Sequence, residues 1–379
     1  MWKICYVVTI PTTIESFFIS QLQYLSLHGF DVTVVCSKSD KLQTILGDTI
    51  RFYPINLPRG ISFGGSIRAI KALLLFFKEE QFDLIQYSTP NAALYASIAA
   101  KAAGCKVRNY HLMGLRYLGS TGIGRIALKI LERIACANST HIECVSESNL
   151  EMGIAEGLFT REKVVVVWNG STGGVDLRKF DYNQRLVWRK DIRAELEYTE
   201  SDFIYGFVGR ITRDKGINEL LEAFLSLNDG SKLLLIGRME GEDTLDKELL
   251  KKARANHDVR FHDAVTDIER YYAAIDVLML PSYREGFGNV VIEAGAVGTP
   301  AIVSNIPGPT DTIDEGKTAL TVEVKNVKDL AVKMKKMQSE DYVAMGIAAA
   351  EFSRDRFENG ELCKRILERK EMLLGMDHI

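Results

Sequence analysis

Short apolar runs alternate with longer amphipathic stretches along the first half of the chain. The apolar runs are rich in Val, Ile and Leu, as at 164–167, which is typical of parallel strands that are buried on both faces. Between them, apolar positions recur with helical spacing, for example over 14–28 and 66–80. The predicted strands of this half are 3–8, 31–36, 51–55, 84–87, 107–111, 141–145 and 164–168.

The second half repeats the alternation, with predicted strands at 204–208, 232–236, 259–261, 277–280, 301–303 and 320–322. Strands that alternate with helices favour a doubly wound parallel sheet. The predicted fold class is therefore α/β, with two Rossmann-like domains. We place them at residues 1–180 and 181–379, because the glycine-rich segment 170–174 gives way to the charged segment 185–197 within this boundary region.

The loop after the predicted strand 277–280 carries two glutamates eight positions apart, Glu285 and Glu293. Gly286 and Gly288 let backbone N–H groups approach a ligand closely, and a helix is predicted to begin near Asn289 with its positive end facing the loop. Carboxylates bind hydroxyl groups and helix N-termini bind phosphate. The pattern therefore suits a phosphorylated, polyhydroxylated ligand.

Two cations, Arg210 and Lys215, follow the predicted strand 204–208. Arg210 lies at the strand end and Lys215 stands just before a helix, with Gly209 and Gly216 in the same turn. Both side chains can converge on a diphosphate, with a helix N-terminus behind them. The alternative is that both are simply solvated residues of a loop.

The two segments together resemble the retaining glycosyltransferases of family four, which have the GT-B architecture of two facing Rossmann-like domains with a cleft between them. The resemblance is dense over 203–320 and looser over 1–180. It implies an N-terminal domain that binds acceptor and a C-terminal domain that binds nucleotide sugar. It also implies that the last helix, predicted at 354–374, packs back on the N-terminal domain.

The resemblance assigns roles to the donor-site residues. Arg210 and Lys215 match the clamp that neutralises the donor diphosphate and stabilises the departing nucleoside diphosphate. Glu285 matches a contact to the transferred sugar and Glu293 a contact to the ribose hydroxyls. The backbone amides of Gly286, Phe287 and Gly288 would reach the sugar or the distal phosphate. The alternative for Glu293 is a structural role, in which its carboxylate interacts with the helix dipole.

In the N-terminal domain, His111 ends a predicted strand and resembles the family's histidine near the donor sugar; a structural histidine is the alternative. Glu147 lies at a matching strand end and is a candidate acceptor contact. The first loop carries Thr12 and Thr13 where many relatives have Gly-Gly. Either threonine, or Ser16, is expected to cap the next helix, and the loop is expected to line the cleft.

Composition limits the class of protein. A chain of 379 residues that is 46% hydrophobic fits two cores. No apolar stretch reaches the roughly 18 residues that a membrane span needs, and the start of the chain does not read as a signal peptide. Six cysteines without a C-x-x-C motif indicate reduced thiols in a cytoplasmic protein. No Asp-x-Asp occurs, so neither a metal nor another cofactor is expected.

The charge differs between the halves. Residues 1–180 hold 19 Lys and Arg against 14 Asp and Glu, whereas residues 181–379 hold 28 against 36, so the net charges are +5 and −8. A basic first half favours an anionic surface such as lipid headgroups on the inner face of the plasma membrane. Arg125, Lys129 and Arg133 share a helical face there. No basic run interleaved with aromatics suggests nucleic acid, and ordinary variation in surface charge is the alternative.

The predicted function is a retaining, metal-independent hexosyltransferase. It would move a hexose or N-acetylhexosamine from a nucleotide diphosphate sugar, with UDP favoured, to a hydroxyl of a lipid-linked glycan. The resemblance to bacterial capsule and O-antigen assembly enzymes supports this acceptor class. The alternatives are a nucleotide-sugar 2-epimerase of the same fold and a non-catalytic nucleotide-sugar-binding protein.

Overall fold

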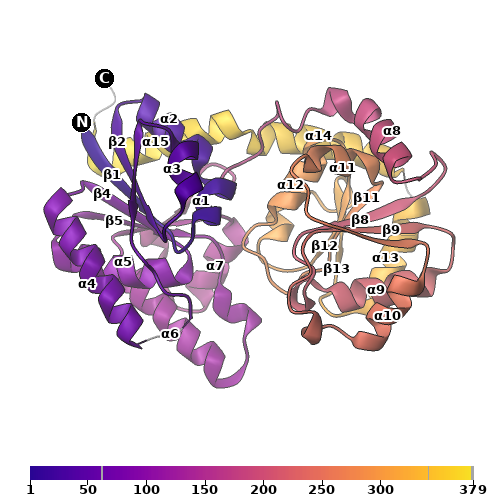
Figure 1. Cartoon of the computed structure of the whole chain (residues 1–379), viewed down its shortest axis with the longest axis horizontal. Coiled ribbons are helices and arrows are strands. Elements are labelled where there is room, and N and C mark those ends of the chain that lie inside the picture. The colour runs from indigo at the N-terminus through magenta and orange to yellow at the C-terminus, as the bar shows by residue number, and fades with distance from the viewer. Residues whose placement is uncertain (61–62, 340, 377–379) are drawn as a thin grey trace. The chain divides into compact units, whose positions relative to one another are not determined.

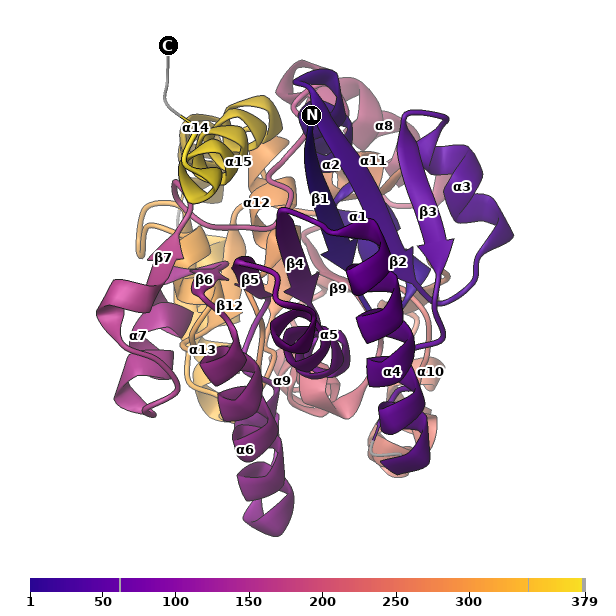
Figure 2. The same cartoon turned by 90° about the vertical axis from the view of Figure 1, so that its left-hand side faces the viewer.

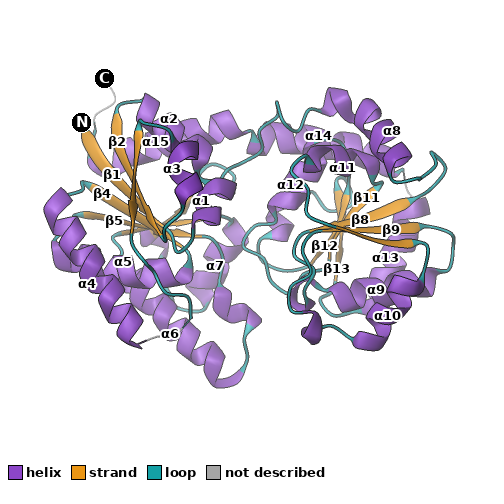
Figure 3. Ribbon diagram, in the orientation of Figure 1, coloured by secondary structure: helices purple, strands orange, loops and turns teal. Residues whose placement is uncertain are grey.

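The computed structural model describes residues 1–60, 63–339 and 341–376 (Figure 1). The chain divides into two compact units. The first unit combines Met1–Gly173 with the C-terminal segment Asn359–Ile379, and the second unit is Gly174–Glu358. Each unit has a central sheet with helices on both faces (Figure 3).

The sheet of the first unit has seven parallel strands in the order β3-β2-β1-β4-β5-β6-β7. This order is doubly wound from the centre, which confirms the predicted fold class. The strands are β1 (Trp2–Val7), β2 (Phe30–Cys36), β3 (Ile50–Pro54), β4 (Leu84–Ser88), β5 (Val107–Leu112), β6 (His141–Cys144) and β7 (Val164–Val166).

Helices cover both faces of the sheet of the first unit (Figure 2). Two layers of buried apolar side chains hold these helices against the sheet. One face is covered by α1 (Pro11–Phe17), α2 (Ile19–Leu27), α3 (Asp40–Leu46) and α15 (Asn359–Leu374). The other face is covered by α4 (Phe63–Glu80), α5 (Pro90–Ala103), α6 (Gly122–Asn138) and α7 (Glu147–Ala155). Short 3₁₀ turns lie at Arg116–Gly119 and Arg161–Lys163.

The sheet of the second unit has six parallel strands in the order β10-β9-β8-β11-β12-β13. The strands are β8 (Ile204–Val208), β9 (Lys232–Ile236), β10 (Val259–His262), β11 (Val277–Leu280), β12 (Ala301–Ser304) and β13 (Ala319–Val322). One face carries α9 (Ile217–Leu227), α10 (Lys247–Ala255) and α13 (Val327–Ser339). The other carries α8 (Arg185–Glu195), α11 (Ile268–Ala274), α12 (Asn289–Ala296) and α14 (Tyr342–Phe357).

The structure divides two of the predicted helices. The stretch 14–28 forms α1 and α2, separated at Phe18, and α1 begins earlier because Pro11 occupies its first turn. The stretch 354–374 contains the end of α14 and the whole of α15, because the backbone of Glu358 is extended (ψ 130°). The units meet in the sequence at this break, and α15 belongs to the first unit, where it packs against α2.

The other junction between the units follows Gly173 rather than residue 180. The amide of Val175 donates to the carbonyl of Phe357 at 2.7 Å. Lys179 Nζ donates to the carbonyl of Thr266 at 3.2 Å. These bonds attach 174–180 to the second unit. The boundary between the units therefore lies earlier in the sequence than the composition suggested.

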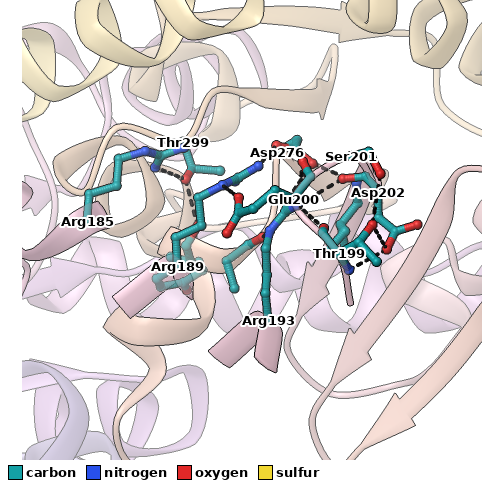
Figure 4. Close-up of polar contacts among 12 residues, drawn as sticks. Arg185, Arg189, Arg193, Thr199, Glu200, Ser201, Asp202, Asp276 and Thr299 are labelled. Carbon is teal, nitrogen blue, oxygen red and sulfur yellow. Dashed lines mark hydrogen bonds and ion pairs between the residues drawn. The ribbon is translucent and has the colours of Figure 1, made fainter. Parts of the chain in front are cut away.

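The charged segment 185–197 is mostly the helix α8, fixed to the second unit by buried ion pairs (Figure 4). Arg185, Arg189 and Arg193 follow each other at helical spacing and point to one side. Arg189 and Arg193 each place a guanidinium nitrogen 2.8 Å from a different carboxylate oxygen of Asp276, which precedes β11. Arg185 donates to Thr299 Oγ1 at 2.7 Å. Asp276 and Arg193 are both about 1% exposed, so the charges of this helix are structural.

All six cysteines are buried and unbridged. Among the residues that the structure describes, no helix combines the length and the apolar character that crossing a membrane would require.

Candidate active site

Lys215 and Glu285 meet at the carboxyl-end edge of the second sheet. β8 and β11 are parallel neighbours, so the loops that follow them emerge side by side. Lys215 Nζ lies 2.5 Å from Glu285 Oε1, and Ser282 Oγ donates to the same oxygen at 2.8 Å. Both charged side chains are less than one fifth exposed, which strengthens their attraction over that of a surface pair.

Close backbone packing holds these two loops together. Gly216 has φ +72°, and a Cβ at this position would lie 2.0 Å from the carbonyl oxygen of Pro281. The amide of Tyr283 donates to the carbonyl of Asp214 at 2.9 Å. Arg284 adds an ion pair to the Asp214 carboxylate at 3.0 Å. Glycine at 216 therefore lets Lys215 come within reach of Glu285.

Arg210 lies in the same loop but does not join the Lys215–Glu285 pair. Its guanidinium is half exposed and lies 3.3 Å from Glu240. Burial raises the pKa of Asp214, but a hydrogen bond from Thr212 and the charges of Arg284, Arg210 and Lys215 outweigh burial and lower it. The loop thus gathers positive charge, with Lys215 held in place and Arg210 on the surface.

The segment 286–288 is fixed by packing on several sides. Gly288 has φ +104° and precedes the first residue of α12. Phe287 is buried, and its ring packs edge-on against Phe357. A Cβ on Gly308 would lie 2.8 Å from the carbonyl oxygen of Gly286, so the loop after β12 supports this segment from behind. The positive end of α12 consequently faces a backbone of fixed shape.

Glu293 lies in the second turn of α12, where it is partly exposed. Tyr272 Oη donates to its carboxylate at 3.0 Å. Burial raises the pKa of Glu293, and the Tyr272 hydrogen bond and the charge of Lys179 offset this effect only in part. The edge of the second sheet thus combines cations, two carboxylates and a helix N-terminus, which suits a ligand with both phosphate and hydroxyl groups.

In the first unit, His111 lies near the end of β5 and is buried. Its Nε2 lies 3.2 Å from Thr172 Oγ1, and its ring packs against Phe18. Its Nδ1 lies 3.9 Å from Glu143 Oε2. Glu143 in turn binds Lys370 of α15 at 2.8 and 2.9 Å.

Neither Glu143 nor Lys370 was predicted from the sequence. The available signals were an acid inside the predicted strand 141–145 and a lysine following the apolar positions Ile366 and Leu367 of the last helix. Burial lowers the pKa of His111 to about 4. Burial would raise the pKa of Glu143, but Lys370 and His111, with Arg369, lower it to about 2.

These shifts predict that stability depends on pH at His111. The folded state keeps His111 neutral and the unfolded state protonates it near pH 6.5, so the contribution of His111 to the free energy of unfolding should fall by about 2–3 kcal/mol between pH 7 and about pH 4.5. Burial raises the pKa of Glu132 to about 7, which changes the free energy of unfolding in the opposite direction over the same range, so the test compares wild type with a His111 variant. Glu143 should add a further loss below about pH 4.5. Urea denaturation at both pH values measures the effect. Relative to wild type, His111→Asn should become more stable by about 2–3 kcal/mol on going from pH 7 to pH 4.5, and the exposed His257→Asn should show the wild-type pH dependence. A wild-type pH dependence in His111→Asn contradicts the assignment.

Glu147 is the first residue of α7 and half exposed, with an ion pair to Arg161 at 3.0 Å. The predicted caps of the first helix are wrong. Thr12 and Thr13 lie in the first turn of α1 and Ser16 lies near its end, because Pro11 starts this helix and Ile10 precedes it without a side-chain cap. In the described part of the chain, no group of three or more His, Cys, Asp or Glu side chains is arranged to hold a metal ion.

The comparisons with known proteins agree with this fold. The structure superimposes on Anabaena Alr3699/HepE in complex with UDP with a TM-score of 0.80, at 18% identity, over 98% of this chain and 100% of that chain. A model described as "Glycosyl transferases group 1" matches residues 189–352, and one described as "Glycosyltransferase Family 4" matches residues 14–171. The chain is therefore a glycosyltransferase of GT-B architecture.

Two curated relatives are similar to this chain over most of its length. The capsular polysaccharide biosynthesis glycosyltransferase CapM of Staphylococcus aureus is 32% identical over 89% of this chain and 88% of its own length. A UDP-Gal:alpha-D-GlcNAc-diphosphoundecaprenol alpha-1,3-galactosyltransferase of Escherichia coli is 24% identical over 99% of this chain and 97% of its own. The chain belongs to glycosyltransferase family 4.

Proposed function

We propose that this glycosyltransferase retains the anomeric configuration and moves a hexose or N-acetylhexosamine from a UDP-sugar to a hydroxyl of a lipid-linked glycan. The acceptor would belong to bacterial surface polysaccharide synthesis. The observation that carries the proposal is Lys215 held against Glu285 beside the N-terminus of α12. The names of the Staphylococcus and Escherichia relatives support the acceptor class, and the UDP complex of HepE supports the nucleotide.

The Lys215–Glu285 pair suggests how the donor would bind. The two side chains neutralise each other, and a bound diphosphate sugar would give each of them a separate partner. Lys215, joined by Arg210, would take the phosphate oxygens, and Glu285 would turn to the sugar hydroxyls. Glu293 would accept from the ribose hydroxyls, and the amides of 286–288 would reach the sugar or the distal phosphate. Because negative charge grows on the departing phosphate, fixed cations there stabilise the transition state more than the ground state.

Transfer would take place on one face of the sugar. The bond from the anomeric carbon to the phosphate oxygen breaks as the acceptor oxygen bonds to the same carbon. The proton of the acceptor hydroxyl passes to the departing phosphate, so no covalent enzyme intermediate forms. His111, Glu147, Thr12 and Thr13 are the candidate contacts of the first unit in this proposal, with Glu147 the exposed acid among them.

No metal is required in this proposal, because Lys215 and Arg210 supply the charge that a divalent cation supplies elsewhere. Transfer should therefore persist in EDTA at no less than about half of its untreated rate. The rate of sugar transfer with and without chelator measures this. Loss of activity in EDTA that magnesium or manganese restores would refute the metal-free proposal.

Donor-only controls separate the alternatives. Incubation with each UDP-sugar and a diphosphate-linked lipid acceptor should give a glycosylated lipid whose new linkage keeps the donor configuration. A donor that is isomerised without acceptor would identify an epimerase. A donor that stabilises the fold, as ligands do by mass action, but is neither transferred nor hydrolysed would identify a binding protein.

We place this reaction at the cytoplasmic face of the plasma membrane, where a lipid-linked acceptor and a soluble nucleotide sugar meet. The basic half of the sequence supports such a location, because cationic surfaces bind anionic lipid headgroups.

A further inference from the structure

Helix α6 exposes a row of isoleucines. The exposed fractions of Ile123, Ile126, Ile130 and Ile134 are 87%, 60%, 52% and 37%. Their spacing of three and four residues places them on one side of a helix with 3.6 residues per turn. We call these four residues the isoleucine face. A contiguous exposed apolar surface of this kind marks a contact site in a soluble fold.

A cavity lies next to the isoleucine face. Its volume is about 420 Å³, and α5 and α6 supply most of its lining. Ala127 and Leu131 of α6 line it, and their positions on the helix lie between the isoleucine face and the buried side. Arg116 lines the same cavity. Apolar surface therefore continues from the outside of α6 around the helix into the cavity.

Cations occupy the opposite flank of the isoleucine face. Arg125, Lys129 and Arg133 follow each other at helical spacing on α6. Arg125 lies 3.0 Å from the carboxylate of Glu156, which also accepts from Lys129. Arg133 donates to the backbone carbonyl of Glu156 at 3.4 Å. These bonds fix the three cations, which we call the basic flank, beside the isoleucine face and partly neutralise them. The isoleucine face is therefore the more distinctive feature of α6.

We propose that α6 lies flat on an anionic bilayer, with the isoleucine face in the interfacial layer and the basic flank over the headgroups. An amphipathic helix with isoleucines on one side and cations beside them binds such surfaces. In Figures 1 and 2, part of α6 extends beyond the strands of its sheet. This inference rests on the proposed lipid-linked acceptor, and it names the surface that brings the first unit to that acceptor.

A bilayer fits this surface better than a second copy of the chain. Two α6 helices that pair through their isoleucine faces would bring two sets of Arg125, Lys129 and Arg133 together, and like charges repel. Anionic headgroups instead complement the cations. The neighbouring cavity has a mixed lining, in which Arg116 and Glu132 accompany apolar side chains, and its apolar part suits a lipid chain.

Flotation with lipid vesicles tests the proposal. Wild type should float with vesicles that contain about 30% phosphatidylglycerol and bind pure phosphatidylcholine more weakly. Ile126→Glu with Ile130→Glu should reduce binding at least about tenfold. The matched control is Val332→Glu with Val343→Glu on α13 and α14, whose valines are 60% and 58% exposed; it should bind like wild type. Equal binding by the isoleucine variant, or no binding by wild type, overturns the proposal.

Two further measurements separate loss of the bilayer contact from unfolding and from dimerisation. Thermal unfolding of the isoleucine variant should match wild type, because the replaced side chains are exposed. Size-exclusion chromatography without vesicles should show the same species for both; a wild-type dimer that the variant loses would replace the bilayer with a second copy. Vesicle binding needs no donor, so it can succeed even if transfer fails. With a short-chain, water-soluble acceptor, the isoleucine variant should transfer at the wild-type rate.

Discussion

Lys215→Ala should reduce sugar transfer by about 10²–10³-fold, the scale of losing one preorganised group that stabilises developing charge. The departing diphosphate would lose the cation that the structure holds 2.5 Å from Glu285. Arg210 remains in the variant, but its exposed ion pair with Glu240 leaves it less well fixed. Steady-state rates with saturating donor and acceptor measure the loss.

Lys232→Ala is the matched control. Lys232 forms an ion pair of the same length, 2.5 Å, with Asp258 in the same unit, and its side chain is similarly buried. It is the first residue of β9, at the other end of the strand from the site. Both variants should lose similar stability, and only Lys215→Ala should lose activity. Near-normal turnover in Lys215→Ala would remove the diphosphate contact from the account.

Asp276→Ala should destabilise the second unit by about 3–5 kcal/mol. The change leaves Arg193, which is about 1% exposed, without its carboxylate, and it removes the partner of Arg189 as well. The amide of Ile204, which donates to Asp276 at 2.7 Å, also loses its acceptor. Figure 4 shows how these side chains converge on one carboxylate. Urea denaturation monitored by circular dichroism measures the change.

Asp314→Ala is the control for this prediction. Asp314 pairs with Lys317 at 2.8 Å in the same unit, but both side chains are substantially exposed. Surface pairs contribute roughly 0–1 kcal/mol, so this variant should unfold close to wild type. If Asp276→Ala were as stable as Asp314→Ala, the buried cluster would not be what fixes α8.

The strands could be predicted from the sequence because most are buried on both faces. The runs 204–208, 232–236 and 277–280 match β8, β9 and β11 residue for residue. A strand of this kind needs an unbroken apolar run, and solvent-facing alternation does not obscure its ends. The start of α12 at Asn289 could also be predicted from the sequence, because Gly288 precedes it.

Helix ends and buried charges were harder to predict. Helical spacing continues across Phe18, so nothing local in the pattern marked the first break. At the second break, Asn359-Gly360 directly follows Glu358 and is a local turn signal, but the helical spacing around it outweighed it in the prediction. The arginines of α8 looked like a solvated boundary segment. Their partner Asp276 is more than 80 residues away in the sequence, and an ion pair over such a separation leaves no periodic signal.

One part of the candidate site could likewise be predicted from the sequence, and another part could not. Parallel strands bring their following loops to one edge, so the proximity of the Lys215 and Glu285 loops followed from topology. Lys215 pairs with Glu285 and does not lie beside Arg210 on a common face. This arrangement depends on side-chain geometry. The Glu143–Lys370 pair joins residues 227 positions apart, and only the return of α15 to the first unit brings them together.

A crystal structure with a bound UDP-sugar would show whether the loops of Lys215 and Glu285 hold the donor. We expect the diphosphate within hydrogen-bond distance of Lys215 and Arg210, the sugar hydroxyls on Glu285 and the ribose hydroxyls on Glu293. A diphosphate bound elsewhere, or density for the nucleotide sugar that leaves Lys215 paired with Glu285, would mean that these residues are not the donor site.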